Sequence, residues 1–367
     1  MIKKKFDRRA FRGKMAQMRR ARQGAPKRSV LEQNNIEYTA TRWPPGIVSF
    51  SSGKERCGIN EYSKGLNQQI RLAGVPVTEM LLHDTSFLAS APAGAEILVH
   101  LEPSLLSQGF DQALHTAHQH QAKIVGCFHY CDPNFFRRFV DYTDTLITHR
   151  DYGITHPKLQ IAPLACPVFH PASRAELRQK HGLPENKKIL TTLGFLTAWK
   201  RIPETVQRLL PEVERQGALL QLLCPTHYSG DPTRETAKLQ ALVRDRTSVL
   251  WKSEFIPEQE MLERTAASDL GFAYHGENTG SCSAANKMFV AARCPLLLTS
   301  SNHDSDVQHG AEHLQNFNLE WFAQRAIELL HDDRRLTRLA AGIQQDYDRM
   351  NQAAVAKRYL ELFKEIK

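Results

Sequence analysis

The chain has little that would embed it in a membrane or cross-link it covalently. Its 367 residues contain no run of about eighteen apolar residues, which excludes an ordinary membrane-spanning helix. The N-terminus is charged from Lys3 onward and lacks an apolar core, so we expect no secretory signal. The seven cysteines are scattered and odd in number, which favours free thiols in a reducing cytoplasm over a disulfide framework.

Several catalytic motifs are also missing. The sequence has no Gly-x-Ser-x-Gly elbow, and Ser-Gly-Lys at 52–54 is too short for a phosphate-binding Walker loop. Cys127, His129 and Cys131 alternate along an expected strand, but no second ligand pair has the spacing of a zinc finger. We therefore expect neither a metal nor another cofactor.

Acidic residues are scarce at the N-terminus. Residues 1–28 contain twelve Lys and Arg and one Asp, a surplus of eleven positive charges, so the rest of the chain carries about −2 of the total of +9. Phe11, Met15 and Met18 fall on one face of a possible helix, a pattern suited to an anionic membrane surface. A solvated, disordered tail is the alternative. Nucleic-acid binding is poorly supported, because only this arm is basic.

From residue 43 the sequence alternates between apolar strands and helical segments. This alternation predicts a parallel sheet covered on both faces, and a chain of this length is expected to form two domains. Pro167 and Pro171 mark a linker, after which the alternation restarts. The fold class is therefore α/β with two similar halves facing a cleft. The expected strands are 47–50, 76–82, 96–101, 123–128, 145–148 and 159–162, then 189–194, 219–224, 248–251, 270–274 and about 296–298.

Residues 336–367 read as helical throughout. Leu339, Ile343, Tyr347 and Met350 trace one apolar face of this segment. A second face follows, and it is formed by Val355, Tyr359, Leu362 and Phe363.

Residues 280–298 form a small-residue loop, a helix of about ten residues and an apolar strand. Free backbone N–H groups, hydroxyls and the helix dipole at such a helix start favour a phosphate or diphosphate. An ordinary N-cap made by Ser281 or Ser283 is the alternative.

In their order along the chain, several segments resemble those of GT-B glycosyltransferases that use nucleotide-sugar donors. They cover roughly residues 45–367 and are Arg56–Tyr62, Phe169–Pro184, Leu193–Arg201, Met288–Pro295 and Val355–Leu360. The sequence departs from the family where two glutamates eight positions apart are common, since Gly280 and Met288 stand there. Arg293 replaces the turn glycine, and Phe195 and Leu196 stand where an arginine is usual.

The resemblance implies two Rossmann-like domains and a C-terminal helix that crosses back to the first. The implied boundaries are a tail at 1–42, an acceptor domain at 43–170, a donor domain at 171–345 and the returning helix at 346–367. It also implies a cytoplasmic enzyme that moves a sugar from a nucleoside diphosphate to a glycan or lipid-linked acceptor. The basic tail would place it on the inner face of the membrane.

The leaving diphosphate gains negative charge in the transition state, so cations and aligned dipoles are the main catalytic resource. By resemblance, the donor diphosphate would be bound by Lys200, Arg201, Thr279, Gly280, Ser281 and Ser283. His129 and Glu277 would be catalytic, through contact with the sugar or proton transfer. The acceptor side would include Gly58, Asn60, Glu61, His100 and Glu102, although Asn60 and Glu61 could instead cap their helix.

Two alternatives remain open at this point. Loss of both family glutamates fits a non-catalytic binding protein, and a nucleotide-sugar epimerase could use a similar two-domain fold.

Overall fold

The computed structural model describes residues 43–53, 57–226, 234–275, 282–299, 306–315 and 318–366. Trp43–Lys367 form one compact unit. The basic tail and its predicted amphipathic helix lie outside the described residues. Among the helices that are described, none combines the length and the apolar character needed to cross a bilayer.

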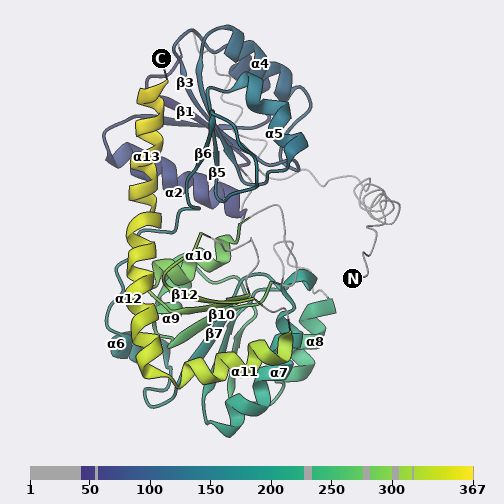
Figure 1. Cartoon of the computed structure of the whole chain (residues 1–367), viewed down its shortest axis with the longest axis vertical. Coiled ribbons are helices and arrows are strands. Elements are labelled where there is room, and N and C mark those ends of the chain that lie inside the picture. Colours follow the sequence, from purple (N-terminus) through teal and green to yellow (C-terminus); the bar gives the residue numbers. More distant parts are fainter. Residues whose placement is uncertain are drawn as a thin grey trace. The chain divides into compact units, whose positions relative to one another are not determined.

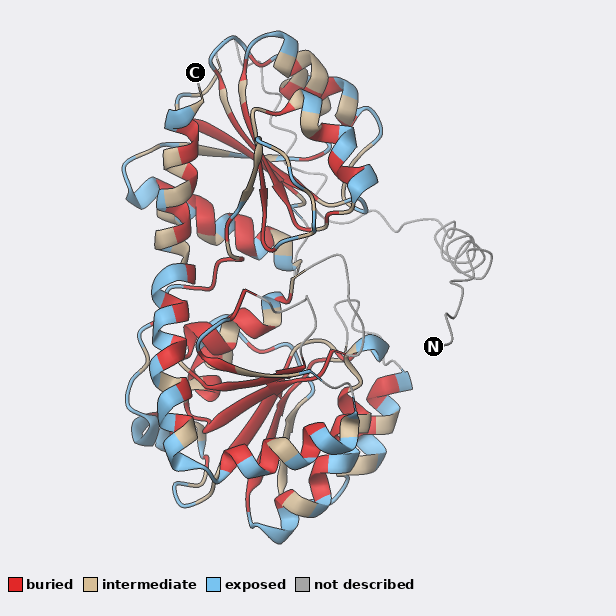
Figure 2. Ribbon diagram, viewed as in Figure 1, coloured by how far each residue is buried: buried red, intermediate tan, exposed pale blue. Residues whose placement is uncertain are grey.

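The first half of the unit is a six-stranded parallel sheet with the strand order β2-β1-β3-β4-β5-β6 (Figure 1). Its four inner strands are almost entirely buried, as expected for a sheet covered on both faces, whereas the two edge strands are partly exposed (Figure 2). The strands of this sheet are β1 (Ile47–Ser51), β2 (Val77–Leu81), β3 (Glu96–Leu101), β4 (Lys123–Phe128), β5 (Thr145–Thr148) and β6 (Leu159–Ile161).

The second half is another six-stranded parallel sheet, with the order β12-β11-β10-β7-β8-β9. In both sheets the strand order reverses near the first strand, which creates a crevice at the carboxyl ends where ligands bind in such folds. The strands are β7 (Ile189–Leu193), β8 (Leu219–Leu223), β9 (Val249–Lys252), β10 (Leu270–Ala273), β11 (Leu296–Thr299) and β12 (Ala311–Leu314).

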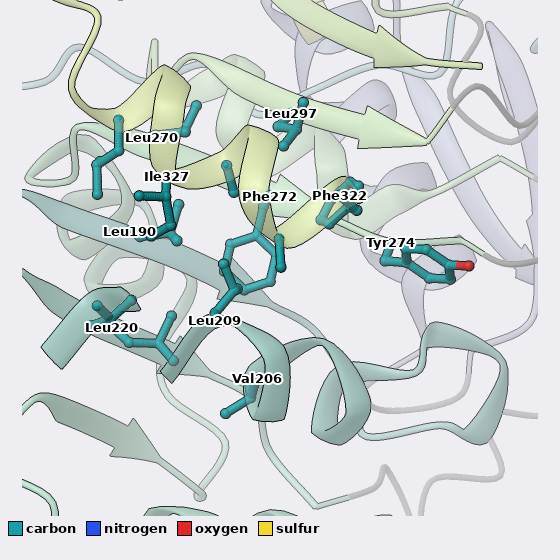
Figure 3. Packing of buried hydrophobic residues seen from close by; sticks show 14 of the residues in the cluster. Leu190, Val206, Leu209, Leu220, Leu270, Phe272, Tyr274, Leu297, Phe322 and Ile327 are labelled. Atoms are coloured by element: carbon teal, nitrogen blue, oxygen red, sulfur yellow. The ribbon is translucent and has the colours of Figure 1, made fainter. Parts of the chain in front are cut away.

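Helices cover both faces of each sheet, which confirms the predicted α/β architecture. On one face of the second sheet, Val206 and Leu209 meet Phe272 and Phe322 in a closely packed core (Figure 3). The α-helices of the described chain are α2 (Gly58–Leu72), α3 (Thr85–Ala89), α4 (Phe110–Gln119), α5 (Pro133–Phe139), α6 (Arg174–His181), α7 (Ile202–Arg215), α8 (Arg234–Val243), α9 (Glu258–Ala266), α10 (Ala284–Ala291), α11 (Leu319–Leu330), α12 (Asp333–Met350) and α13 (Gln352–Glu365).

The C-terminal segment is two helices rather than the predicted single one. Asn351 is extended, with φ −63° and ψ 149°, and its side chain caps α13 by accepting a hydrogen bond from Ala354 N at 3.0 Å. The backbone of Asn351 also bridges to Cys166. The prediction of one continuous helix was wrong here. The residue that separates the two helices is a polar N-cap residue, and not the Pro or Gly that would have signalled a break in the sequence.

The break at Asn351 sends the two predicted apolar faces to different sheets. Ile343, Tyr347 and Met350 of α12 pack in a core of the second sheet. Val355 and Tyr359 of α13 pack with α2 and β4 of the first. The last helix therefore returns to the first half, as the resemblance implies.

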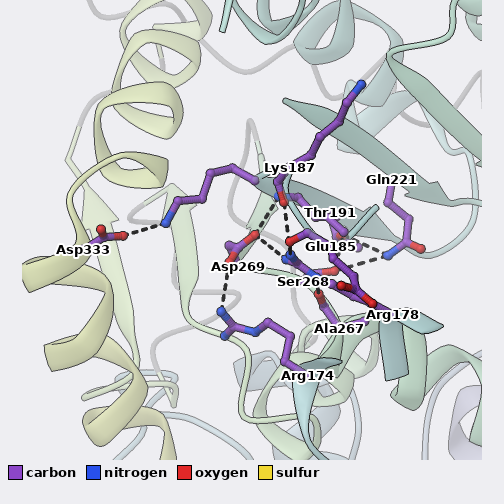
Figure 4. Close-up of polar contacts among 12 residues, drawn as sticks. Arg174, Arg178, Glu185, Lys187, Thr191, Gln221, Ala267, Ser268, Asp269 and Asp333 are labelled. Atoms are coloured by element: carbon purple, nitrogen blue, oxygen red, sulfur yellow. Dashed lines mark hydrogen bonds and ion pairs between the residues drawn. The ribbon is translucent and has the colours of Figure 1, made fainter. Parts of the chain in front are cut away.

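Helix α6, which follows the linker, is held by a buried charged cluster (Figure 4). Asp269 Oδ2 accepts hydrogen bonds from Arg178 Nη2 and from Ile189 N, both at 2.7 Å. Arg178 also donates to the carbonyls of Ala267 and Lys187. The cluster thus ties α6 to the first strand of the second sheet.

Candidate functional site

A cavity of about 540 Å³ lies at the carboxyl ends of the strands and is lined from both halves of the compact unit. The first half contributes Gly58, Glu61 and Tyr62, and the second contributes residues around Gly194 and the start of α10. We call it the cleft cavity. Its volume falls within the range of small-molecule sites in proteins, about 300–1,000 Å³.

Lys200 reaches the cleft cavity from the loop after β7. Gly194, at the end of that strand, has φ +105°. A Cβ at Gly194 would lie 2.5 Å from Lys200 Nζ and 3.1 Å from the Cβ of Ala285. The ammonium therefore lies next to the first turn of α10, where the helix dipole is also positive.

The start of α10 is built from small residues. Ser283 is the N-cap, and its hydroxyl accepts a hydrogen bond from Asn286 N at 3.3 Å. Ser283, Ala284 and Ala285 line the cleft cavity. The N-cap role was the plainer of the two sequence interpretations, and Ser283 performs it while facing the cavity. Four other predicted residues, Glu277, Thr279, Gly280 and Ser281, lie outside the described residues.

Unlike the adjacent Lys200, Arg201 does not line the cleft cavity. Its backbone adopts the left-handed conformation at φ 48°, and its guanidinium carbon lies 5.6 Å from the centre of the Tyr274 ring. Adjacent residues in this tight turn point in different directions, so the structure does not bring both cations to one place.

Glu61 lines the cleft cavity from α2, opposite Glu258 of α9. The pKa of Glu258 is raised, first by partial desolvation and then by the negative charge of Glu61. Neither Asn60 nor Glu61 caps α2, because Cys57 occupies the N-cap position. Asn60 is buried and lines neither cavity described here, and its carbonyl accepts a hydrogen bond from Ser63 Oγ at 2.9 Å.

A second cavity of about 360 Å³ lies over the first sheet. We call it the acceptor-side cavity after the predicted acceptor-side residues that line it. Gly58, Glu102, His129 and His149 are among its lining residues. Glu102 accepts a hydrogen bond from Ser104 N at 2.8 Å, so its carboxylate is held in its own turn. Of the predicted acceptor-side residues, Gly58 and Glu102 thus line this cavity, and Gly58 lines both.

His100 is fully buried and does not line either cavity. Its Nδ1 lies 3.0 Å from Nε2 of His129, which faces the acceptor-side cavity. Burial lowers the pKa of His100 to about 3 and that of His129 well below its usual value, with the charge of His149 as the second cause. Both rings are therefore neutral near pH 7.

The predicted alternation of Cys127, His129 and Cys131 on one face does not hold. Strand β4 ends at Phe128, and Cys131 packs in the core on the other side of the sheet from Cys127. His149, and not Cys131, lies beside Cys127: the distance from His149 Nε2 to Cys127 Sγ is 3.5 Å. Sequence reasoning missed His149, although it directly follows strand β5 as His129 follows β4.

Lys287 is a second residue that the sequence interpretation missed. It lines the cleft cavity, yet its side chain is only 1% exposed and its Nζ lies 2.7 Å from Asp306 Oδ1. A single charged residue within the apolar helix α10 was the available signal. Met288, at one of the family glutamate positions, also lines this cavity.

No protein-family model matches this chain, and no curated protein does.

Comparison with solved structures gives clear matches. A glycosyltransferase from Rickettsia africae ESF-5 superposes with a TM-score of 0.68 at 12% identity, over 87% of this chain and 98% of that one. Anabaena HepE, in complex with UDP and glucose, gives 0.65 at 11% identity, over 88% and 100%. An E. coli trehalose-6-phosphate protein bound with UDP-2-fluoro glucose gives 0.56 at 13%, over 78% of each chain. The chain therefore has the GT-B fold of these structures, as its sequence motifs indicated.

Proposed function

We propose that this protein is a glycosyltransferase that moves a sugar from a nucleoside-diphosphate donor to a glycan or lipid-linked acceptor. The observation that carries the proposal is the convergence of the Lys200 ammonium and the N-terminus of α10 beside Gly194. Both supply positive potential at one point of the cleft cavity, where a departing diphosphate needs it. Solved structures of the same fold that contain UDP or a UDP-sugar support this choice of donor.

In this proposal, residues 171–345 hold the donor and residues 43–170 hold the acceptor. Glu61 and Gly58 face the donor site across the cavity, and His129 faces the acceptor-side cavity. As a neutral ring in the wall of that cavity, His129 would contact the bound sugar. Lys200 and the helix dipole supply the positive charge at the diphosphate, so we expect the transfer to need no metal there.

The donor site is tested by isothermal titration calorimetry with UDP and GDP. Lys200→Ala removes the ammonium from the cleft, and we expect UDP affinity to fall at least tenfold, about 1.4 kcal/mol. Arg201→Ala is the matched control, since it removes an adjacent cation that does not line the cavity. Equal loss in both variants, or unchanged binding in Lys200→Ala, contradicts the proposed site.

A non-catalytic binding protein is the second candidate, because Met288 stands at a family glutamate position and lines the cavity. Release of free UDP or GDP from a panel of nucleotide sugars, with acceptor extract present, separates the two functions. Binding without turnover would support the second candidate.

The membrane association is a separate part of the proposal and rests on the excess of Lys and Arg in residues 1–28. Deleting these residues should abolish co-sedimentation with anionic lipid vesicles and leave nucleotide binding intact. Unchanged sedimentation would contradict this part alone.

A further inference from the structure

Four nitrogen- and sulfur-bearing side chains meet at the carboxyl ends of three neighbouring strands of the first sheet. His100 is on β3, Cys127 on β4, His129 just after β4 and His149 just after β5. His100 and Cys127 are paired in register across the two strands. Their exposed fractions are 0%, 0%, 8% and 2% in that order, so water scarcely reaches the cluster.

Three separations within this cluster lie close to those between the ligands of one tetrahedral ion. Cys127 Sγ lies 3.7 Å from His129 Nε2 and 3.5 Å from His149 Nε2, and His100 Nδ1 lies 3.0 Å from His129 Nε2. A zinc ion with Zn–S of about 2.3 Å and Zn–N of about 2.0–2.1 Å separates its ligand atoms by roughly 3.3–3.6 Å. Ligand atoms of His100, Cys127 and His129 all lie within 4.8 Å of one another, and His149 adjoins this group of three through its contact with Cys127.

Groups around the cluster orient two of these atoms. His149 Nδ1 lies 3.2 Å from the carbonyl oxygen of Ala162, which only accepts, so Nδ1 carries the proton and Nε2 keeps its lone pair toward Cys127. The Tyr359 hydroxyl donates to Cys127 Sγ at 3.0 Å. Hydrogen bonds from outer groups to the first ligands are typical of metal centres.

Hydrogen bonding alone does not account for the contacts at His129. Nε2 of His129 has two neighbours, His100 Nδ1 and Cys127 Sγ, but it offers them only one proton or one lone pair.

We propose that His100, Cys127, His129 and His149 form a binding site for one divalent transition-metal ion, with Zn²⁺ as the preferred occupant. Imidazole and thiolate ligands select zinc, cobalt or copper over magnesium and calcium. Binding replaces the S–H bond of Cys127 by a metal–sulfur bond and releases one proton to solvent. The ion enters from the acceptor-side cavity, which His129 and His149 line.

This site is distinct from the donor diphosphate site, and it does not depend on the proposed transferase function. With the ion in place, His129 is a fixed wall of the acceptor-side cavity and does not carry protons. From the sequence we expected no metal, because Cys127, His129 and Cys131 were the ligands considered. The proposed site uses His100 and His149 in place of Cys131.

The test titrates the untagged full chain, stripped with chelator, with CoCl₂. Tetrahedral cobalt with a thiolate ligand gives strong visible d–d bands and a near-ultraviolet charge-transfer band. We expect both bands to saturate at one ion per chain and to disappear when Zn²⁺ is added. Cys127→Ser should abolish the charge-transfer band, whereas Cys131→Ser, the matched control on the other side of the sheet, should retain it.

His149→Gln, at the cavity wall, is the second variant, and it should weaken cobalt binding at least tenfold. Circular dichroism checks that each variant is folded. Zinc content of the protein as purified, measured by mass spectrometry, needs no variant at all. Absence of both bound zinc and the cobalt bands in the wild type overturns the proposal, as does an unchanged charge-transfer band in folded Cys127→Ser.

Discussion

The ammonium of Lys200 occupies space beside Gly194 that the Cβ of any other residue would enter. The separation between Lys200 Nζ and that Cβ would be only 2.5 Å, and Ala285 closes the other side at 3.1 Å. Because Gly194 has no side chain, the lysine side chain can lie against the backbone there and extend toward the start of α10. A glycine at this strand end leaves room for the lysine in the position that the proposed donor site uses.

Replacing Gly194 by alanine should therefore weaken nucleotide binding. The flexible lysine would move away from the new methyl group, and we expect UDP affinity to fall about tenfold or more by isothermal titration calorimetry. The positive φ of +105° adds a cost to folding. Gly182→Ala is the control, since Gly182 has φ +63° but nothing within 4 Å of its added Cβ. Equal effects of the two variants would show that backbone strain, and not the lysine, is responsible.

The buried pair of Arg178 and Asp269 should matter more to stability than any surface ion pair. Their side chains are 8% and 7% exposed, and Asp269→Asn leaves the guanidinium without its counter-charge. Loss of one partner of such a pair costs about 3–5 kcal/mol, which guanidinium chloride unfolding would measure. Glu212→Gln is the comparison, because Glu212 and its partner Arg215 are 41% and 64% exposed. Its loss should have a much smaller effect, because solvent screens an exposed pair.

A pH-dependent contribution to stability is expected from Glu263. A hydrogen bond from Lys180, with others from Gln259 and His181, lowers the pKa of Glu263 from 4.5 to about 2. The folded state thus favours the carboxylate, so the stabilisation is complete above pH 4.5 and is lost as the pH falls toward 2. Glu263→Gln should lose about 1–3 kcal/mol at pH 7, and its difference from wild type should shrink steadily below pH 4.5.

Glu258 on the same helix provides a control of opposite sign. Its pKa is raised, so the folded protein binds a proton there more readily than the unfolded chain does. Glu258→Gln should not lower the free energy of unfolding at pH 7. If the difference in the free energy of unfolding between wild type and Glu263→Gln stayed constant from pH 7 to 3, the lowered pKa of Glu263 would be wrong.

The strands of the two sheets could be predicted well from the sequence, whereas the side-chain clusters could not. Buried parallel strands are short apolar runs, so segments such as 96–101 and 123–128 were predicted to the residue. Strand β12 was not predicted, because it is an edge strand with Glu312 and His313 at its centre and lacks that apolar pattern. The directions of Arg201 and His100 depend on a turn and on neighbouring strands, which spacing along one chain does not encode.

The break between α12 and α13 illustrates the same limit and yields a last prediction. Cys166 N donates to Met350 O at 2.8 Å, and Gln352 N donates to Cys166 O at 2.9 Å, so Asn351 must be extended between them. Its Oδ1 caps α13, and its Nδ2 donates to the carbonyl of Tyr347 at 3.0 Å.

Asn351→Ala removes both side-chain interactions and favours continuation of the helix. We expect a loss of about 0.5–2 kcal/mol in the free energy of unfolding, measured by urea denaturation. Asn351→Asp keeps the capping oxygen but loses the amide donor, so its stability should lie between the other two. If alanine were as stable as asparagine, the backbone pairing with Cys166 alone would hold the break, and the capping side chain would contribute nothing to sending α13 back to the first sheet.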